Sequence, residues 1–416
     1  MNRILILSHG HPSLSIGGGE NAAYAIHKQM RGHPDWQSWF LAAAPAGKIP
    51  EGKDLMELPD KQEFLVRSST DSFFCSSECN LSGNSEVKSL VSRIQPDVIH
   101  VNHFINLGFD LLYAMRMWCP KALFLYTFHE FLLQCPLNGQ LLTSNQELCS
   151  SNSLQACQKC LPYVTIDDLT LRRELVYNLV ANIDYFIAPS KQLKKIFVTW
   201  GIKDNRIRII DYILPEDIIK KGDIARSKNV PQWFFGFFGN CVPSKGLDLL
   251  LEAMVILVQK LPIATLIVNG PINNKTKKES AEHKYWKRVH TLLDHLGSNV
   301  IVNGPYHQPD VSNLMSKVGW VVMASRWFEN SPVVIQEARA CGRPLIVPAM
   351  GGMAEKVKNG VDGIHYEPNS VISLVASLER CCVDHDLFTS LKKSIRKPPI
   401  AQAIIEHETA FTTPKK

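Results

Sequence analysis

Short runs of apolar residues alternate with longer amphipathic stretches along most of the chain. In the first half the apolar runs are RILILSHG, WQSWFLAA, DVIHVNH, ALFLYTFH, YFIAPS and RIRIID. In the second half they are FFGFFG, ATLIVNG, NVIVNGPY, WVVMAS and RPLIVPA. Stretches such as GLDLLLEAMVILVQKL and HKYWKRVHTLLDHLG carry apolar residues at helical spacing. Continuous apolar strands that alternate with such helices are typical of parallel sheets covered by helices on both faces.

Eleven strands are too many for one compact doubly wound domain, so we expect an α/β protein of two Rossmann-like domains that face each other across a cleft. The break falls near DYILPED, which predicts an N-terminal domain over 1–210 and a C-terminal domain over 211–385. A segment rich in Cys, Ser and Asn at 131–165 breaks the alternation and is predicted to be an inserted loop. The tail over 386–416 is expected either to pack on the first domain or to be partly disordered.

The composition agrees with this picture, with 416 residues, of which 45% are hydrophobic and 20% are charged. A net charge of +6 is too mild to indicate nucleic acid binding, but it suits an anionic ligand or an anionic membrane surface. The apolar run at 4–7 is too short for a signal peptide, and no run approaches the roughly 20 apolar residues of a membrane span. We therefore expect a cytoplasmic protein whose 11 cysteines are mostly reduced.

The stretch WFENSPVVIQEA carries two carboxylates, Glu329 and Glu337, with seven residues between them. Ser331 is a natural N-cap and Pro332 suits the first position of a helix, so Glu329 is expected in the loop between the strand WVVMAS and that helix. Ligands of open parallel sheets bind at this edge, where a helix N-terminus also favours phosphate. Glu337 lies inside the helix, where it is useful only if it points at ligand hydroxyls. The plain alternative is a loop charge and a solvated helix residue.

A buried strand, a Gly-Gly-x-x-Glu turn and a Gly-x-x-Gly pair follow in RPLIVPAMGGMAEKVKNGVDGIHYEP. This order resembles the nucleotide-sugar half of the retaining glycosyltransferases of the GT-B fold, family 4, whose hallmark is E-x7-E. The resemblance implies that Glu337 holds ribose hydroxyls of a nucleotide-sugar donor. It also implies that Glu329 contacts the donor sugar near the reacting carbon. Matching motifs run from residue 4 to about 367.

Two glycine-containing loops extend the resemblance. SIGGGENAAYAI matches the family's N-terminal glycine loop, which implies that Gly17, Gly18 and Gly19 lie against the donor diphosphate or sugar. Alone it would be an ordinary βα turn, and it lacks the G-x-G-x-x-G spacing of a dinucleotide site. FFGNCVPSKGLDLLLEA matches the family's glycine–basic–x–KG loop. Lys245 keeps the second cation there, whereas Asn240 replaces the usual Arg.

Polar residues also follow two strands of the predicted acceptor domain. DVIHVNHFINLGFDLL carries Asn102 and His103 where many relatives have paired histidines, and YTFHEF supplies His129 and Glu130. Histidines at strand ends are often boundary residues, but two at neighbouring ends indicate an active site, so His103 and His129 are catalytic candidates. The loop NGPYHQPDV lies where relatives read the base of the donor.

The insert contains a cluster of cysteines. Its members are Cys135, Cys149, Cys157 and Cys160, the last two forming C-x-x-C. This spacing is typical of a tetrahedral thiolate site, and a loop poor in apolar residues would gain order from a structural zinc. Reduced thiols are the alternative. Cys75 and Cys79 are also close enough in sequence to pair.

The stretch SKQLKKIFVTWGIK at 190–203 is a basic amphipathic helix, suited either to an anionic membrane surface or to the outside of a Rossmann domain. A peripheral contact on the inner face of the membrane is thus an open expectation for the location of the protein.

The resemblance implies a retaining transferase that moves a sugar from a nucleotide-diphosphate donor to a hydroxyl of a glycan or lipid-linked acceptor. Bacterial cell-surface polysaccharide or glycolipid synthesis is the implied pathway. No D-x-D motif follows a strand, so catalysis is expected to need no metal cofactor. Two alternatives stay open: a nucleotide-sugar epimerase of the same fold, and a degenerate binding subunit, which Asn102 and Asn240 favour.

Overall fold

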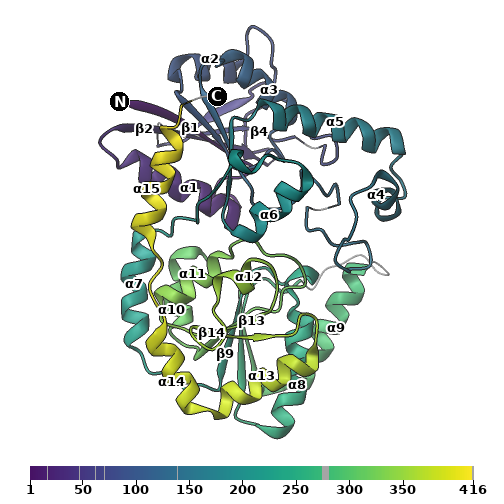
Figure 1. Cartoon of the computed structure of the whole chain (residues 1–416), viewed down its shortest axis with the longest axis vertical. Helices are drawn as coiled ribbons and strands as arrows, with labels where there is room; N and C mark the ends of the chain where they lie inside the picture. Colours follow the sequence, from purple (N-terminus) through teal and green to yellow (C-terminus); the bar gives the residue numbers. More distant parts are fainter. Residues whose placement is uncertain are drawn as a thin grey trace. The chain divides into compact units, whose positions relative to one another are not determined.

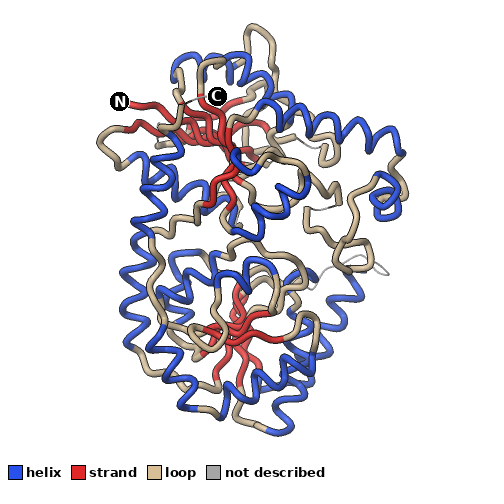
Figure 2. The backbone as a smooth tube through the Cα atoms, viewed as in Figure 1, coloured by secondary structure: helices blue, strands red, loops and turns tan. Residues whose placement is uncertain are grey.

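A computed structural model describes most of the chain. The described residues are 1–15, 17–45, 47–60, 62–69, 71–137, 139–273 and 281–414. They form two compact units, and unit 1 comprises Met1–Ile213 with Ile400–Lys416, while unit 2 comprises Leu214–Pro399. Each unit is built on its own sheet, with helices packed around the strands (Figures 1 and 2). The predicted α/β class with two parallel-sheet domains is confirmed.

The sheet of unit 1 has eight strands in the order β3-β4-β2-β1-β5-β6-β7-β8. The bounds are β1 Asn2–Ser8, β2 Trp36–Ala44, β3 Leu55–Glu57, β4 Glu63–Arg67, β5 Val98–Val101, β6 Leu123–Thr127, β7 Tyr185–Ala188 and β8 Ile207–Ile209. All neighbouring strands run parallel except β3, which pairs antiparallel with β4 at the edge. Six of these strands correspond to predicted runs, whereas β3 and β4 were missed.

The helices of unit 1 cover this sheet. They are α1 Gly18–Arg31, α2 Glu86–Ile94, α3 Phe109–Trp118, α4 Leu154–Cys160, α5 Ile166–Asn182, α6 Lys191–Trp200, the 3-10 turn η1 Asp204–Arg206, and α15 Ile400–Phe411. Thr165 and Asp168 form a reciprocal capping box at the start of α5, just where the predicted insert ends. Helix α15 returns to unit 1 from the far end of the chain, and Phe411 packs edge-on against Trp36 in the core.

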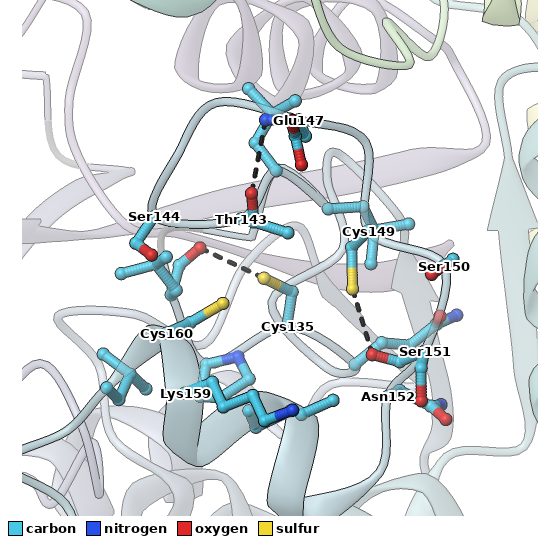
Figure 3. A pocket seen from close by; sticks show the side chains of 18 of the residues that line it. Cys135, Thr143, Ser144, Glu147, Cys149, Ser150, Ser151, Asn152, Lys159 and Cys160 are labelled. Atoms are coloured by element: carbon cyan, nitrogen blue, oxygen red, sulfur yellow. Dashed lines mark hydrogen bonds between the residues drawn. The ribbon is translucent and has the colours of Figure 1, made fainter.

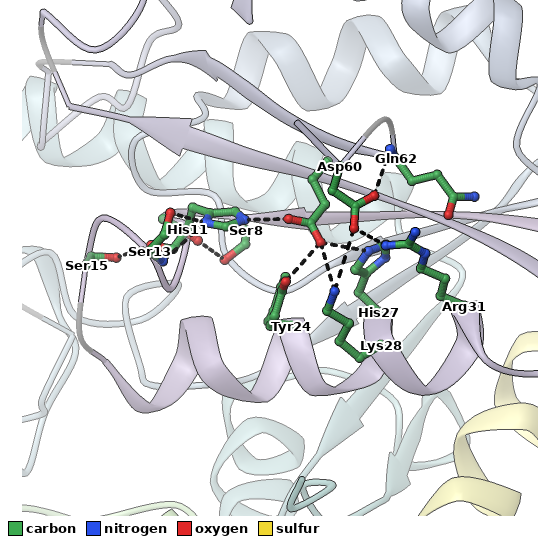
Figure 4. A network of polar contacts seen from close by, with 12 residues as sticks. Ser8, His11, Ser13, Ser15, Tyr24, His27, Lys28, Arg31, Asp60 and Gln62 are labelled. Atoms are coloured by element: carbon green, nitrogen blue, oxygen red, sulfur yellow. Dashed lines mark hydrogen bonds and ion pairs between the residues drawn. The ribbon is translucent and has the colours of Figure 1, made fainter. Parts of the chain in front are cut away.

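Helix α1 is anchored by a buried carboxylate on β4 (Figure 4). Glu63 accepts hydrogen bonds from Tyr24 (2.9 Å) and Lys28 (3.3 Å) on α1, and it lies 3.2 Å from His11. Burial opposes its ionisation, but the hydrogen bonds from His27, Tyr24 and Lys28 hold the pKa of Glu63 well below its usual range. The network thereby fixes the helix that begins at the glycine loop.

The apolar side of α6 is part of the core of unit 1. Leu193 and Phe197 are buried, and the ring of Phe197 stacks on Phe128 with centroids 3.7 Å apart. Leu193 and Phe197 are therefore used in packing, whereas Trp200 on the same helix is only partly buried. Among the described residues, no helix is both long and apolar enough to cross a bilayer.

The sheet of unit 2 has six parallel strands in the order β11-β10-β9-β12-β13-β14. The strands are β9 Phe234–Phe238, β10 Thr265–Asn269, β11 Val300–Gly304, β12 Trp320–Val322, β13 Leu345–Pro348 and β14 Gly363–Tyr366. The helices are α7 Glu216–Ser227, α8 Leu247–Lys260, α9 Ala281–Leu296, α10 Val311–Met315, α11 Val333–Ala340, α12 Gly351–Lys356, α13 Val371–Val383 and α14 His385–Ser394, with the 3-10 turns η2 Pro243–Lys245, η3 Gly297–Asn299 and η4 Gln308–Asp310. The sequence predicted five of these strands and missed β14.

The observed units differ slightly from the predicted segments. The first division falls between Ile213 and Leu214, three residues beyond the predicted break. Of the predicted tail over 386–416, α14 belongs to unit 2, whereas the part from Ile400 onward belongs to unit 1.

Each sheet contains one point at which the strand order reverses direction along the chain. In unit 1 this point lies between β1 and β5, and in unit 2 it lies between β9 and β12. Ligands of open α/β sheets bind beyond the carboxyl ends of the strands at such points. The loops after these four strands are therefore where a site is expected, and they contain most of the polar residues singled out in the sequence.

Candidate functional site

The loop after β9 brings a lysine to the reversal point of unit 2. Lys245 ends the turn η2, and Gly246 has φ +66° as α8 begins. A Cβ atom at position 246 would lie 2.0 Å from the carbonyl oxygen of Ala324, so only glycine lets the two loops approach this closely. Asn240, in the place of the expected first cation, is exposed on the same loop.

The first glutamate of the E-x7-E pair is held by three donors on one oxygen. Oε1 of Glu329 accepts hydrogen bonds from Ser325 Oγ (2.8 Å) and Trp327 Nε1 (2.7 Å), and it forms an ion pair with Lys245 Nζ (2.5 Å). Glu329 is buried. The carboxylate therefore has a fixed direction, which is the arrangement expected of a group that must be aimed before a ligand arrives.

The predicted Gly-Gly turn supports the loop that carries Glu329. The N–H of Gly352 donates to the carbonyl of Glu329 (2.6 Å), and a Cβ atom at position 352 would lie 1.7 Å from the carbonyl oxygen of Asn330. Gly351 has φ +57°, which favours glycine. The two glycines are thus required by the close approach of two loops.

The prediction that Ser331 caps the following helix is wrong. Helix α11 begins at Val333, and Pro332 occupies the cap position without a side-chain cap hydrogen bond. Ser331 is instead a buried residue of the loop. The loop contacts Gly352, and the helix starts one residue later than the capping pattern suggests.

The second glutamate, Glu337, is buried on α11 rather than solvated. Gln308 Nε2, from the loop predicted to read the base, donates to its Oε1 at 3.3 Å. Burial raises the pKa of Glu337 to about 7, against a smaller opposing effect of that hydrogen bond. A buried carboxyl with one amide donor is poorly satisfied, so a ligand hydroxyl would find a strong acceptor there.

A buried ion pair joins the two loops of this site. Arg326 donates to both carboxylate oxygens of Asp248, at 2.6 and 3.0 Å, and to the carbonyl of Pro243 at 3.1 Å. Such a bidentate pair is geometrically specific. Arg326 and Asp248 were not singled out in the sequence, and they fix the start of α8 against the loop after β12.

Glu337→Gln is expected to stabilise the ligand-free protein at alkaline pH. The pKa of Glu337 rises on folding, so the folded chain binds this proton more tightly than the unfolded chain does. Stability is consequently lost as pH rises from about 4.5 to about 7. The variant avoids that loss. Its free energy of unfolding should therefore increase relative to that of the wild type, by on the order of 1–3 kcal/mol more at pH 8 than at pH 5. Urea unfolding at both pH values measures it, with the exposed Glu379→Gln as control; an equal effect of both variants would contradict the assignment.

In unit 1, two histidines lie at the ends of neighbouring strands, as expected. His103 Nδ1 accepts the N–H of Ile105 (3.0 Å), so the proton of the neutral ring is on Nε2, which lies 3.2 Å from Glu130 Oε1. Burial lowers the pKa of His103 well below its usual value, and it raises the pKa of Glu130 to about 8. At neutral pH this pair therefore consists of an uncharged imidazole and a protonated carboxyl.

The second histidine is oriented on both sides. His129 Nε2 donates to Asn102 Oδ1 (3.1 Å), and Nδ1 accepts from the hydroxyl of Tyr212 (2.9 Å), whose ring stacks on the imidazole. Burial lowers the pKa of His129 to about 3. Asn102, which replaces a histidine of the expected pair, thus has a defined partner. This edge of unit 1 offers neutral hydrogen-bonding groups that suit hydroxyls.

The glycine loop adjoins a histidine–glutamate pair that sequence reasoning missed. His9 follows β1 and its ring packs on His103 at 4.6 Å between centroids, while its Nε2 lies 3.4 Å from Glu20 Oε2. Although burial acts against it, the hydrogen bond from His9 lowers the pKa of Glu20 to about 2. A Cβ atom on Gly17 would lie 2.2 Å from Glu20, and one on Gly19 would lie 3.2 Å from His9. A polar residue directly after β1 was the signal that could have revealed His9.

The structure brings some of the predicted residues together and not others. In unit 2, the neighbouring loops after β9 and β12 carry Lys245, Glu329 and Ser331, and the adjoining helix carries Glu337. In unit 1, one edge of the sheet carries His103, His129 and the glycine loop. The four cysteines of the insert line one cavity. Among the described residues, however, no group of three or more His, Cys, Asp or Glu side chains is close enough to hold a metal ion.

Two family models match the chain. "Glycosyltransferase Family 4" matches residues 16–211, and "Glycosyl transferases group 1" matches residues 220–397. Together they span nearly all of both units. The first match includes the glycine loop and both histidines, and the second includes Lys245 and the two glutamates.

Curated relatives are similar over part of their length. The Bacillus subtilis protein YtcC is 30% identical over 162 residues, which are 39% of this chain and 39% of YtcC. The lipopolysaccharide 1,2-N-acetylglucosaminetransferase of Salmonella typhimurium is 29% identical over 151 residues, which are 36% of this chain and 39% of that enzyme. The chain thus matches about two fifths of the length of these relatives.

Solved structures match over the whole chain. A crystal structure of HepE from Anabaena, in complex with UDP and glucose, has a TM-score of 0.64 at 18% identity and covers 98% of each chain. The sucrose-phosphate synthase of Thermosynechococcus elongatus has a TM-score of 0.70 at 16% identity, covering 99% of this chain and 98% of that one. At these identities the likeness shows the fold.

Proposed function

Because this chain belongs to the family 4 glycosyltransferases of the GT-B fold, we propose that it transfers a sugar from a nucleotide-diphosphate sugar to a hydroxyl acceptor with retention of configuration. Unit 2 binds the donor, and the histidine-bearing edge of unit 1 serves the acceptor. The acceptor is a glycan or a lipid-linked sugar of a bacterial surface polysaccharide or glycolipid, a class to which the Salmonella relative's name also points.

The observation that carries the proposal is the pairing of Lys245 with Glu329 at the reversal point of unit 2. Lys245 uses one N–H on Glu329 and has a side chain that is 30% exposed, so its other N–H groups can meet a diphosphate. As the bond to the leaving diphosphate breaks, negative charge grows on its oxygen and positive charge grows on the sugar carbon. A cation and a carboxylate held side by side suit those two charges.

Donor binding at this site is proposed to use Glu337 for the ribose. Among the described residues, Gln308 is the one hydrogen-bond donor to its buried carboxyl. Two vicinal hydroxyls would supply the hydrogen bonds that burial denies it. Tyr306 precedes this loop residue and packs edge-on against Phe238, which gives the base a firm neighbouring surface. The phosphate needs no metal in this proposal, because Lys245 and backbone N–H groups supply the positive charge.

The acceptor edge is proposed to bind hydroxyl groups rather than charged ones. His103, His129 and Glu130 are all uncharged at neutral pH. A sugar hydroxyl would bind there by replacing one of the protein partners of these groups, such as Asn102 or Tyr212 on His129. In a retaining transfer the leaving phosphate oxygen can take the acceptor proton, so a strongly basic imidazole is not required. The neutral histidines are thus compatible with catalysis.

Donor binding tests the proposal. UDP-, GDP- and ADP-sugars are titrated calorimetrically into the wild type, and one of them should bind. Glutamine keeps one acceptor oxygen, so the variant Glu337→Gln loses one hydrogen bond to a charged group, which costs about 1.5–3 kcal/mol. Glu337→Gln should then weaken that donor roughly 10-fold to 100-fold, mainly through the nucleoside. Glu379→Gln, on the exposed side of α13, should bind like the wild type. Binding of none of the donors by the wild type would overturn the proposal.

A degenerate binding subunit is the alternative that Asn102 and Asn240 suggested, and measurable donor hydrolysis or transfer would exclude it. Asn102 has a defined role in orienting His129, and Asn240 is a solvent-exposed loop residue. An epimerase of the same fold would act on the donor alone. Incubation with donor in the absence of acceptor, followed by sugar analysis, separates it from a transferase.

A further inference from the structure

The inserted segment of unit 1 surrounds a cavity of about 300 Å³ that is lined by sulfur (Figure 3). Its wall includes four of the chain's 11 cysteines, all with free thiols: Cys135, Cys149, Cys157 and Cys160. They come from three separate pieces of chain, because Cys135 follows β6, Cys149 follows a small turn, and the other two lie on α4. The fold therefore gathers thiols that are up to 25 residues apart in sequence.

This segment has few other means of holding its shape. Between Thr127, at the end of β6, and Leu154, at the start of α4, the described residues contain no helix or strand and only the isolated bridge Leu142–Leu148. The local apolar cluster has a core of three buried residues: Leu161, Val164 and Leu169. Irregular segments of this length inside compact domains are uncommon without a cross-link or a ligand.

A buried cation beside the cavity points to a negative partner. Arg172 is 3% exposed, and it donates hydrogen bonds to the backbone carbonyls of Phe73 and Leu132. Leu132 belongs to the insert, so this buried positive charge lies against the segment that carries the cysteines. Thiolates bound to a metal would bring negative charge to that segment.

We propose that Cys135, Cys149, Cys157 and Cys160 together bind one Zn²⁺ that cross-links the insert to unit 1. This role is structural and independent of the proposed sugar transfer. Zinc holds four thiolates at about 2.3 Å, closer together than these sulfurs stand across the cavity, so the ion draws the three pieces of chain inward. Each thiol loses its proton on binding, and the S–H groups of Cys135 and Cys149 release the carbonyls of Leu137 and Ser151.

Elemental analysis of the untagged, reduced full-length chain tests the proposal. The wild type should contain about one zinc per chain, either as purified or after addition of Zn²⁺ and desalting. Cys157→Ser and Cys160→Ser should each retain less than about one fifth of that. Cys119→Ser is the matched control, because Cys119 is a partly buried thiol of unit 1 outside the cavity, and it should keep full zinc.

Two further measurements use the wild type, so their outcome does not depend on whether the cysteine variants fold. Substitution by Co²⁺ should give sulfur-to-cobalt charge-transfer bands and the visible bands of a tetrahedral ion. Mercurial titration should release the metal as about four thiols react. The proposal is overturned if reduced wild type binds neither ion, if both serine variants keep full zinc, or if the metal is iron in a sulfide cluster.

Discussion

Lys245→Ala is expected to lower kcat/KM for the nucleotide-sugar donor roughly 100-fold to 1000-fold, the usual cost of removing one preorganised group that stabilises transition-state charge. The reason is that Lys245 is the cation that η2 places beside Glu329, and Gly246 holds it there by its close approach to Ala324. Steady-state kinetics with saturating acceptor measures the change. The variant should also bind the nucleoside diphosphate more weakly than the wild type does, and it should bind the nucleoside alone as tightly as the wild type does.

Lys260→Ala provides the matched control for this variant. Lys260 ends the same helix, α8, and pairs with Glu379 on the surface, so its loss should leave activity within about twofold of wild type, as expected for an exposed ion pair. Lys245→Arg should recover part of the activity, because it restores charge with a different shape. If Lys245→Ala bound nucleoside and nucleoside diphosphate with equal losses, the lysine would not be the phosphate contact.

The second large effect is expected from Glu329→Gln, with kcat falling roughly 100-fold, or about 2.7 kcal/mol, and donor KM changing little. Glutamine is nearly isosteric and its amide oxygen can still accept from Ser325 and Trp327, so the loop should keep its shape. The negative charge is lost, and with it an interaction that strengthens as positive charge develops on the sugar carbon.

Glu252→Gln is the control for this second variant, since Glu252 is a partly exposed residue of α8 that pairs with Arg288. Circular dichroism and unfolding midpoints should show that both proteins are folded. A rise in donor KM at unchanged kcat would place Glu329 in ground-state binding, contrary to the role assigned to it here.

The sequence predicted those strands that read as continuous apolar runs, and it missed the others for physical reasons. β3 has three residues and pairs only along one side, so no apolar run marks it. β4 begins with Glu63, a charged residue whose burial depends on partners from α1 that no local pattern reveals. β14 begins with Gly363 and contains His365, which makes its sequence resemble the end of a turn.

The sequence predicted those site residues that belong to a recognisable motif, but not how they are brought together. Lys245, Glu329 and Glu337 stand out by spacing. The three donors to Glu329 come together only when the loop after β12 folds back on itself and also meets the turn η2, which carries Lys245. The Glu20–His9 pair likewise depends on how the segment after β1 turns. The cap was misplaced because contact with Gly352, from the next βα turn, determines where α11 begins.

The return of α15 to unit 1 has a consequence for the order in which the molecule forms during synthesis. All of unit 2 leaves the ribosome before the residues from Ile400 onward, yet Ala403 and Phe411 are part of the core that contains β1 and β2. Unit 1 therefore keeps an apolar face uncovered until the residues of α15 have also been synthesised. Unit 2, whose residues are continuous in sequence, can finish first, so the domain made second is the first that can be complete.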